Sequence, residues 1–97
     1  MKNYLELADF FHEATLEERL LGIAKRTKKI RKRRGLTQAA LADKSSVSYG
    51  TVKRFEQSGQ ISLESLFRLA LALGIDNELD KLFASVPPTY EEMQHGR

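Results

Sequence analysis

The spacing of apolar side chains along the chain predicts helices and no strand. Between Thr15 and Gly35, apolar side chains recur at intervals of three and four residues, which is the period of one helix face. Thr15 and Glu18 match a capping box, and Gly35 follows a basic last turn, so these residues mark the two ends of a helix. The apolar line predicted to face the core comprises Leu16, Leu20, Ile23, Thr27 and Ile30.

Three further helix starts share one local pattern. A Ser or Thr follows an apolar residue, and a second apolar residue stands five positions after the first, as in a hydrophobic staple around an N-cap. The pattern predicts short helices over about 38–45, 49–57 and 63–73. The caps and their apolar pairs are Thr37 with Leu36 and Leu41, Ser48 with Val47 and Val52, and Ser62 with Ile61 and Leu66. The third helix is expected to bury Leu63, Leu66, Phe67, Ala70, Leu71 and Leu73 and to stop at Gly74.

Shorter elements are predicted near both ends of the chain. Asp76 is expected to cap a short helix, and Thr89 to cap one last turn after two prolines. An additional amphipathic helix is predicted in the N-terminal extension, residues 1–14. The central domain then spans 15–84, and a short C-terminal tail spans 85–97. The helix after Asp76 is expected to carry Leu79, Leu82 and Phe83.

The turn between the helices predicted at 38–45 and 49–57 is only about three residues long. Such a turn forces two short helices to cross steeply, as in a helix-turn-helix, and Ala42 supplies the small side chain that the crossing needs. The second helix then presents a polar outward face that a DNA major groove can accept. The residues expected inside are Leu41, Val47, Val52 and Phe55, and those expected outside are Tyr49, Gly50, Thr51, Lys53 and Arg54.

One third of the chain is strongly basic. Residues 23–54 hold eleven Lys or Arg and one acid, a net charge of +10, and the remainder carries −7 to give the total of +3. Charge concentrated in this way favours a polyanionic partner, with a merely solvated helix face as the alternative. Helix geometry lets only a few of these residues reach phosphates, and we expect Arg33 and Arg34 to do so because they lie nearest the helix end.

The chain resembles the Xre family of bacterial and phage repressors in segments 33–42, 47–56 and 62–74. The most specific part of the resemblance is Gly35-Leu36-Thr37-Gln38. The resemblance covers roughly residues 20–84. It implies an all-α, compact five-helix domain, lambda-repressor-like, that binds a palindromic operator in double-stranded DNA as a homodimer. By position, it also implies roles for individual side chains. Gln38 would bind a phosphate or brace the recognition helix, and Ser48 would cap that helix and offer its amide to a phosphate. The positions expected to face base edges are Tyr49, Gly50 and Thr51. Lys53 and Arg54 would follow them, with Arg54 able to read guanine.

Each of these side chains also has a plainer interpretation. Tyr49 could pack on the domain surface, Thr51 could assist the helix start, and Lys53 could be a solvated charge.

The sequence departs from the family pattern in two places. Ser46 stands where a turn Gly is common, so it must tolerate a left-handed backbone or a different turn. The loop from Glu56 to Ser62 is one residue longer and lacks the usual Pro.

The variant loop between Arg54 and Leu63 looks like that of Xre regulators encoded beside HipA-type kinases. Such HipB-like proteins repress their own toxin–antitoxin operon and bind the kinase. The resemblance therefore implies an autoregulatory repressor with a HipA-like kinase as a second partner. A protein-interaction module whose DNA binding is secondary is the alternative function, and nonspecific nucleic-acid binding through the basic patch is a third.

Other classes of function find little support in the sequence. Cysteine is absent, and His12 and His95 have no partner at metal or triad spacing, so we expect neither an enzyme nor a metal or cofactor. No Gly-rich phosphate loop is present. The chain also lacks an apolar run near the roughly 18 residues of a membrane span, and a cytoplasmic location is expected.

Overall fold

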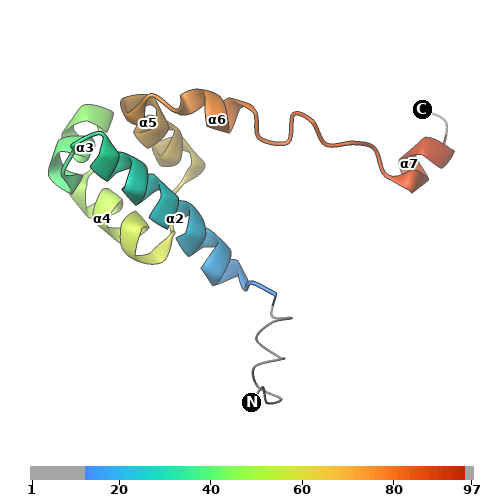
Figure 1. Cartoon of the computed structure of the whole chain (residues 1–97), viewed down its shortest axis with the longest axis horizontal. Helices are drawn as coiled ribbons and strands as arrows, with labels where there is room; N and C mark the ends of the chain where they lie inside the picture. Colours follow the sequence, from blue (N-terminus) through green and yellow to red (C-terminus); the bar gives the residue numbers. More distant parts are fainter. Residues whose placement is uncertain (1–12, 96–97) are drawn as a thin grey trace, which may run out of the picture.

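The computed structural model describes residues 13–95 of the 97-residue chain. Within these residues the regular elements are six helices, and no strand is found (Figure 1). The resemblance implied five helices; the sixth lies in the C-terminal tail. The N-terminal helix predicted in the extension lies outside the described residues. The helices are α2 (Leu16–Arg33), α3 (Gln38–Ser45), α4 (Tyr49–Ser58), α5 (Leu63–Leu73), α6 (Asp76–Asp80) and α7 (Tyr90–Gln94).

Five of these helices have a Ser or Thr N-cap at the position predicted from the sequence. In each case the cap oxygen accepts a hydrogen bond from the backbone amide three residues later, which satisfies one of the free amides of the first turn. The predicted bounds of α3 and α5 are confirmed, and α4 is one residue longer than predicted. The caps are Thr15, Thr37, Ser48, Ser62 and Thr89, and the first and last form complete capping boxes.

The predicted start and extent of α6 are wrong. Ile75, rather than Asp76, occupies the cap position, and no side chain caps this helix. The Ile75 amide donates to the Ala70 carbonyl at the end of α5, and α6 begins at the next residue, so the only residue between Gly74 and α6 is an isoleucine, which has no oxygen to cap the helix. The helix ends at Asp80, which leaves Leu82 and Phe83 outside it and exposed.

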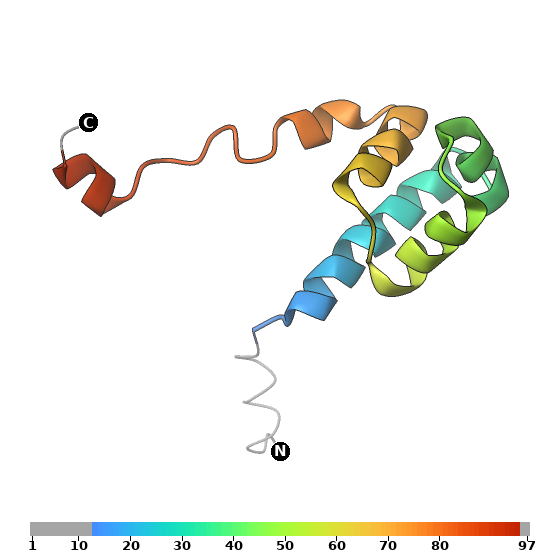
Figure 2. The same cartoon turned by 180° about the vertical axis from the view of Figure 1, so that it is seen from behind.

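The core lies where α2, α3, α4 and α5 meet. The helix-turn-helix is confirmed, because α3 and α4 pack against each other while α2 lies along α4 and α3 contacts α5 (Figure 2). Ala42 is buried close to the turn, as the steep crossing requires. The buried apolar residues that form this core are Ala24, Leu41, Ala42, Val47, Val52, Phe55, Leu69 and Leu73.

Two predicted apolar faces need correction. The buried line of α2 passes through Ala24, Thr27 and Arg31, whereas Leu16 and Ile23 are exposed. The C-cap of α4, Gly59, packs against the backbone of Leu20, so the first turn of α2 projects beyond the domain. On α5 the buried residues include Leu69, which was not predicted, while Leu63 and Leu71 are exposed.

Candidate nucleic-acid interface

The turn between α3 and α4 is held by Ser45 and Ser46. The buried Ser45 hydroxyl donates to the Ala42 carbonyl at 3.3 Å and accepts from the Val47 amide at 3.2 Å. Ser46 adopts φ 60° and ψ 24°, so this chain makes the left-handed turn with a residue that has a Cβ. The turn fixes the direction in which α4 leaves α3, and with it the orientation of the α4 outward face.

Four of the residues predicted to lie on the outward face of α4 are exposed there: Tyr49, Gly50, Lys53 and Arg54. Tyr49 is half exposed, and the Lys53 Nζ lies 5.9 Å from the centre of its ring, within the range of a cation–π contact. Gly50 has open space where a Cβ would stand. Arg54 is exposed one turn after Gly50. Aromatic, cationic and guanidinium groups thus share one open helix face, which suits the base edges and phosphates of a major groove.

Ser48 and Thr51 are joined at the start of α4. The Ser48 hydroxyl accepts from the Thr51 amide at 3.1 Å and donates to the Thr51 hydroxyl at 2.8 Å. Thr51 is half buried. The Thr51 hydroxyl therefore stabilises the start of α4 by accepting from Ser48. It can still donate one hydrogen bond and accept another, and a base edge could supply these partners.

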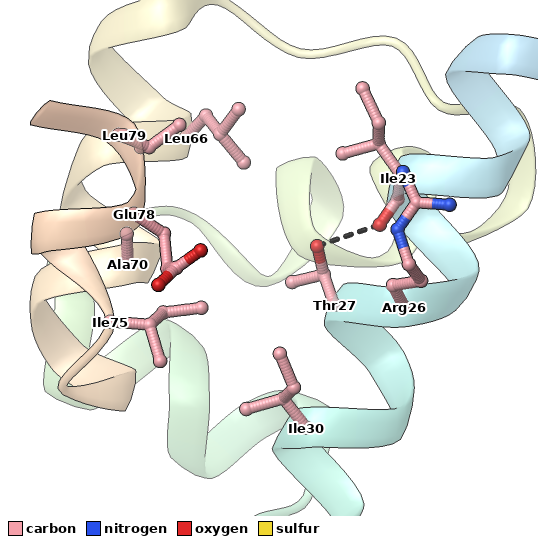
Figure 3. A pocket seen from close by; sticks show the side chains of 9 residues that line it. All are labelled: Ile23, Arg26, Thr27, Ile30, Leu66, Ala70, Ile75, Glu78 and Leu79. Carbon is pink, nitrogen blue, oxygen red and sulfur yellow. Dashed lines mark hydrogen bonds between the residues drawn. The ribbon is translucent and has the colours of Figure 1, made fainter. Parts of the chain in front are cut away.

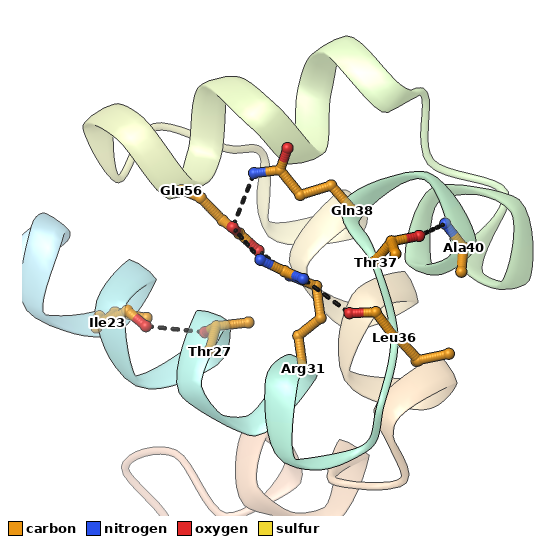
Figure 4. Close-up of polar contacts among 8 residues, drawn as sticks. All are labelled: Ile23, Thr27, Arg31, Leu36, Thr37, Gln38, Ala40 and Glu56. Atoms are coloured by element: carbon orange, nitrogen blue, oxygen red, sulfur yellow. Dashed lines mark hydrogen bonds and ion pairs between the residues drawn. The ribbon is translucent and has the colours of Figure 1, made fainter.

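Arg31 and Glu56 attach α4 to α2 (Figure 4). The Arg31 guanidinium donates to both carboxylate oxygens of Glu56, at 2.7 and 3.0 Å, and its third contact is the Leu36 carbonyl at 2.7 Å. Gln38 donates from its side-chain amide to the same carboxylate at 2.9 Å. The side chains of Arg31 and Glu56 are 7% and 2% exposed, so the pair lies out of water. Four segments are connected here: α2, the loop after it, α3 and α4.

The charge of Glu56 is stabilised by this arrangement. Burial raises the pKa of the Glu56 carboxyl, but hydrogen bonds from Arg31 and Gln38 lower it, and the positive charges of Arg31 and Lys28 lower it further. The net result is a pKa below the ordinary value for glutamate. Glu56 is therefore an anion that neutralises Arg31, and Arg31 is not a free cation of the basic patch.

The basic side chains at the end of α2 have different roles. The Arg34 Nε donates to the Leu73 carbonyl at 3.1 Å, so Arg34 caps the last turn of α5. Arg33 is exposed. The two arginines predicted to bind phosphates are therefore not equivalent, because only Arg33 is left without a fold-stabilising hydrogen bond among those found in the described residues.

A polar hollow lies between α4 and the N-terminus of α5. The free amides of the first turn of α5 give this end of the helix a partial positive charge, and the Arg54 side chain borders the same hollow. Donors of this kind suit a phosphate oxygen next to the groove that α4 would occupy. The sequence interpretation did not single out this hollow, which is lined by Thr51, Arg54, Gln60, Ile61, Ser62 and Ser65.

Two residues that matter for the site were missed from the sequence. Arg31 was counted with the basic patch, and Glu56 was treated only as part of a motif. The signal for Arg31 was its position: it continues the buried line of Ala24 and Thr27 at helical spacing. Its partner stands 25 residues away in the chain, which periodicity alone does not reveal.

The comparison with protein families agrees with this geometry. The family model HTH_3, described as helix-turn-helix, matches residues 28–76, just over half of the chain. The chain belongs to this helix-turn-helix family. Membership indicates a DNA-binding regulator of transcription. No curated protein matched the chain.

Residues 13–95 can also be considered for other kinds of site. None of the helices in this part of the chain is long and apolar enough to cross a membrane. The same residues contain no cluster of three or more His, Cys, Asp or Glu side chains that could hold a metal ion.

Proposed function

We propose that this protein is a sequence-specific transcriptional repressor that binds a palindromic operator as a homodimer, with α4 in the major groove. The observation that carries the proposal is the division of α4 into two faces. Phe55 and Glu56 attach it to the domain, while Tyr49, Lys53 and Arg54 remain exposed. A helix held on one side and polar on the other can enter a groove without losing its position.

Affinity and selectivity come from different residues in this proposal. Exposed cations at the end of α2 and on α4, among them Arg33 and Lys53, would bind phosphates and supply the salt-sensitive part of the affinity. Tyr49 and Arg54 would contact base edges, with Arg54 able to donate two hydrogen bonds to guanine. Gln38 would hold the orientation of α4 through Glu56. The proposal contains no catalytic step, and it places the protein in the bacterial cytoplasm with the DNA.

The regulated operon is part of the proposal. The loop after α4 resembles that of HipB-like regulators, so we assign the repressor to its own toxin–antitoxin operon, with a HipA-like kinase as the second partner. The alternative is a protein-interaction module that binds such a kinase and for which DNA binding is secondary.

The test compares the DNA upstream of the gene with a scrambled duplex of equal length across a salt series. We expect selective binding that weakens steeply with salt. Arg54→Ala should reduce the preference for the operator by about 5- to 150-fold, corresponding to 1–3 kcal/mol. Arg68→Ala is the matched control, because Arg68 is an exposed arginine of α5 that pairs with Glu64.

Each result separates the proposed functions. Equal binding of both duplexes by the wild type would contradict the operator-reading repressor, and so would an Arg54→Ala variant with unchanged preference. If wild-type DNA binding is weak while a co-purified kinase is bound tightly, the protein-interaction module is the better description.

A further inference from the structure

An apolar groove runs between α2 and the corner formed by α5 and α6. Figure 3 shows Ile23 and Ile30 of α2 on one side, facing Leu66, Ile75 and Leu79 across an open space. The cavity volume is about 280 Å³, at the lower end of the roughly 300–1,000 Å³ of small-molecule sites. Ile23 is 41% exposed. The groove is a largely apolar surface with one cation and one anion in its lining, Arg26 and Glu78, and it shares no residue with the outward face of α4.

The C-terminal tail carries the complementary kind of surface. Figures 1 and 2 both show that the chain leaves the domain after α6 and that α7 stands apart from the other helices. Several large apolar side chains along this segment are exposed, and Phe83 is 83% exposed. A series of this kind in water marks a contact surface. The exposed apolar residues of the tail are Leu82, Phe83, Val86, Tyr90 and Met93.

The charges of the tail and of α2 are opposite. Residues 82–94 contain Glu91 and Glu92 and no basic residue. Every charged residue from Arg19 to Arg34 is basic, and Arg26 borders the groove. The opposite wall carries one acid, Glu78 of α6, so the complementarity concerns the α2 side of the groove only. A tail segment placed in the groove would bring its two acids close to the basic surface of α2 if they face that side.

The direction of the tail favours the groove of another molecule over its own. Phe83 adopts φ 63°, a left-handed conformation, and the chain then continues away from α6 (Figure 1). The groove wall formed by Ile75 and Leu79 lies just before this point in the chain. For a docked segment that begins at Leu82 to enter its own groove, the chain would have to reverse between Asp80 and Leu82.

We propose that residues 82–93 of one copy dock in the groove between α2 and α5–α6 of a second copy, and that the second copy returns the same contact. Reciprocal exchange of one segment is self-complementary and gives a closed two-fold dimer. Both outward faces of α4 remain free in this arrangement. This inference deepens the homodimer of the proposed function, but its test needs no DNA, so failure here and failure of operator binding are distinguishable.

The test measures molar mass by sedimentation velocity over a concentration series. The wild-type full chain is compared with a tail variant, Phe83→Asp with Val86→Asp, and a groove variant, Ile23→Lys. We expect a wild-type dimer and at least a tenfold rise in the dimer dissociation constant for each variant. Leu71→Lys is the matched control, because Leu71 is exposed on α5 but outside the groove, and it should leave the dimer intact.

A mixing experiment tests the pairing itself. A tail variant and a groove variant together retain one intact tail and one intact groove. An equimolar mixture should therefore contain more dimer than either variant alone at the same total concentration. A wild-type monomer would overturn the proposal, as would a tail variant that dimerises like the wild type. A wild-type monomer with a protease-resistant tail would indicate docking in the tail's own groove. The tail substitutions lie outside the packed domain, so unfolding cannot explain their effect, and circular dichroism checks the groove variant.

Discussion

Arg31 on α2 and Glu56 on α4 are joined by two hydrogen bonds, of 2.7 and 3.0 Å, although 25 residues separate them in the chain. Both side chains are almost fully buried. A buried bidentate ion pair fixes both position and angle, because two donors must meet two acceptors in one plane. The orientation of the candidate recognition helix is thus set by α2 as well as by the turn that precedes it.

Removal of the Glu56 charge should strongly destabilise the domain. Glu56→Gln leaves the Arg31 guanidinium buried without a counter-ion, which typically costs about 3–5 kcal/mol. Urea denaturation checks this expectation. The double variant Arg31→Met with Glu56→Leu is the control, since replacing both charges by apolar groups should recover most of the lost stability. Equal stability of Glu56→Gln and wild type would show that the pair does not hold α4.

The same pair predicts how stability depends on pH. The pKa of Glu56 is lowered in the folded state, so its contribution is fully present above the pKa of the unfolded chain, about 4.3, and is lost as the pH falls through the folded-state pKa. The difference in unfolding free energy between wild type and Glu56→Gln should be constant near pH 7 and shrink below about pH 4.3. Chemical denaturation from pH 3 to pH 7 measures it. A constant difference down to pH 3 would contradict the assignment.

Gly59 should tolerate no side chain. Its φ is +81°, and an added Cβ would lie 2.5 Å from the backbone carbon of Leu20. The left-handed conformation costs about 1–2 kcal/mol and the overlap about 1–3 kcal/mol more, so Gly59→Ala should lower stability by the sum of both. Gly35→Ala is the control, because Gly35 has φ +76° but open space around it, and only the first cost applies. Equal losses for the two variants would exclude the close approach to Leu20.

Gly50 allows stability and DNA binding to be separated. Gly50→Ala adds a methyl group in open space within a helix, and should raise stability by about 0.5–1 kcal/mol. The same methyl group would stand between α4 and the groove floor, so operator affinity should fall. Thermal melting and operator titration measure both quantities. Gly22→Ala on α2 is the control: it meets Arg26 only at an ordinary 3.5 Å and should stabilise without loss of DNA binding. An unchanged operator affinity in Gly50→Ala would argue against close contact at this position.

The turn at Ser46 should be improved by glycine. Because φ at Ser46 is 60°, Ser46→Gly relieves about 1–2 kcal/mol of left-handed strain but adds about 0.4–1 kcal/mol of unfolded-state entropy. We expect a net gain of about 0.5 kcal/mol, visible as a higher urea midpoint. Ser46→Val provides the opposite case, since a β-branched residue is poorly suited to this backbone region and should destabilise.

What could be predicted from the sequence is what depends on neighbours in the chain. Thr37, Ser48 and Ser62 identified three helix starts because a cap acts on an amide three residues later. The turn between α3 and α4 followed from the short distance between two such starts. Local rules of this kind need no knowledge of the fold.

Two of the errors arose where a distant element decides the outcome. Ile23 matches a helical apolar line, yet α5 and α6 do not close over it, and Arg31 is buried because Glu56 reaches it from another helix. The start of α6 was wrong for a local reason: Gly74 ends α5 and Ile75 follows it directly, so Asp76 is already the first residue of α6. The nine side chains and backbone positions predicted for DNA contact remain predictions, since their test requires the operator.

The two faces of α4 have a consequence for how such a regulator can change. Val52, Phe55 and Glu56 connect the helix to the domain, whereas Tyr49 and Arg54 contribute nothing to the buried core. Substitutions on the outer face should therefore change the free energy of unfolding very little, whereas substitutions on the inner face should lower it. Duplicated copies of such a gene could acquire new operators through a few replacements while the scaffold stays the same, and an engineer could exploit the same separation to retarget this protein.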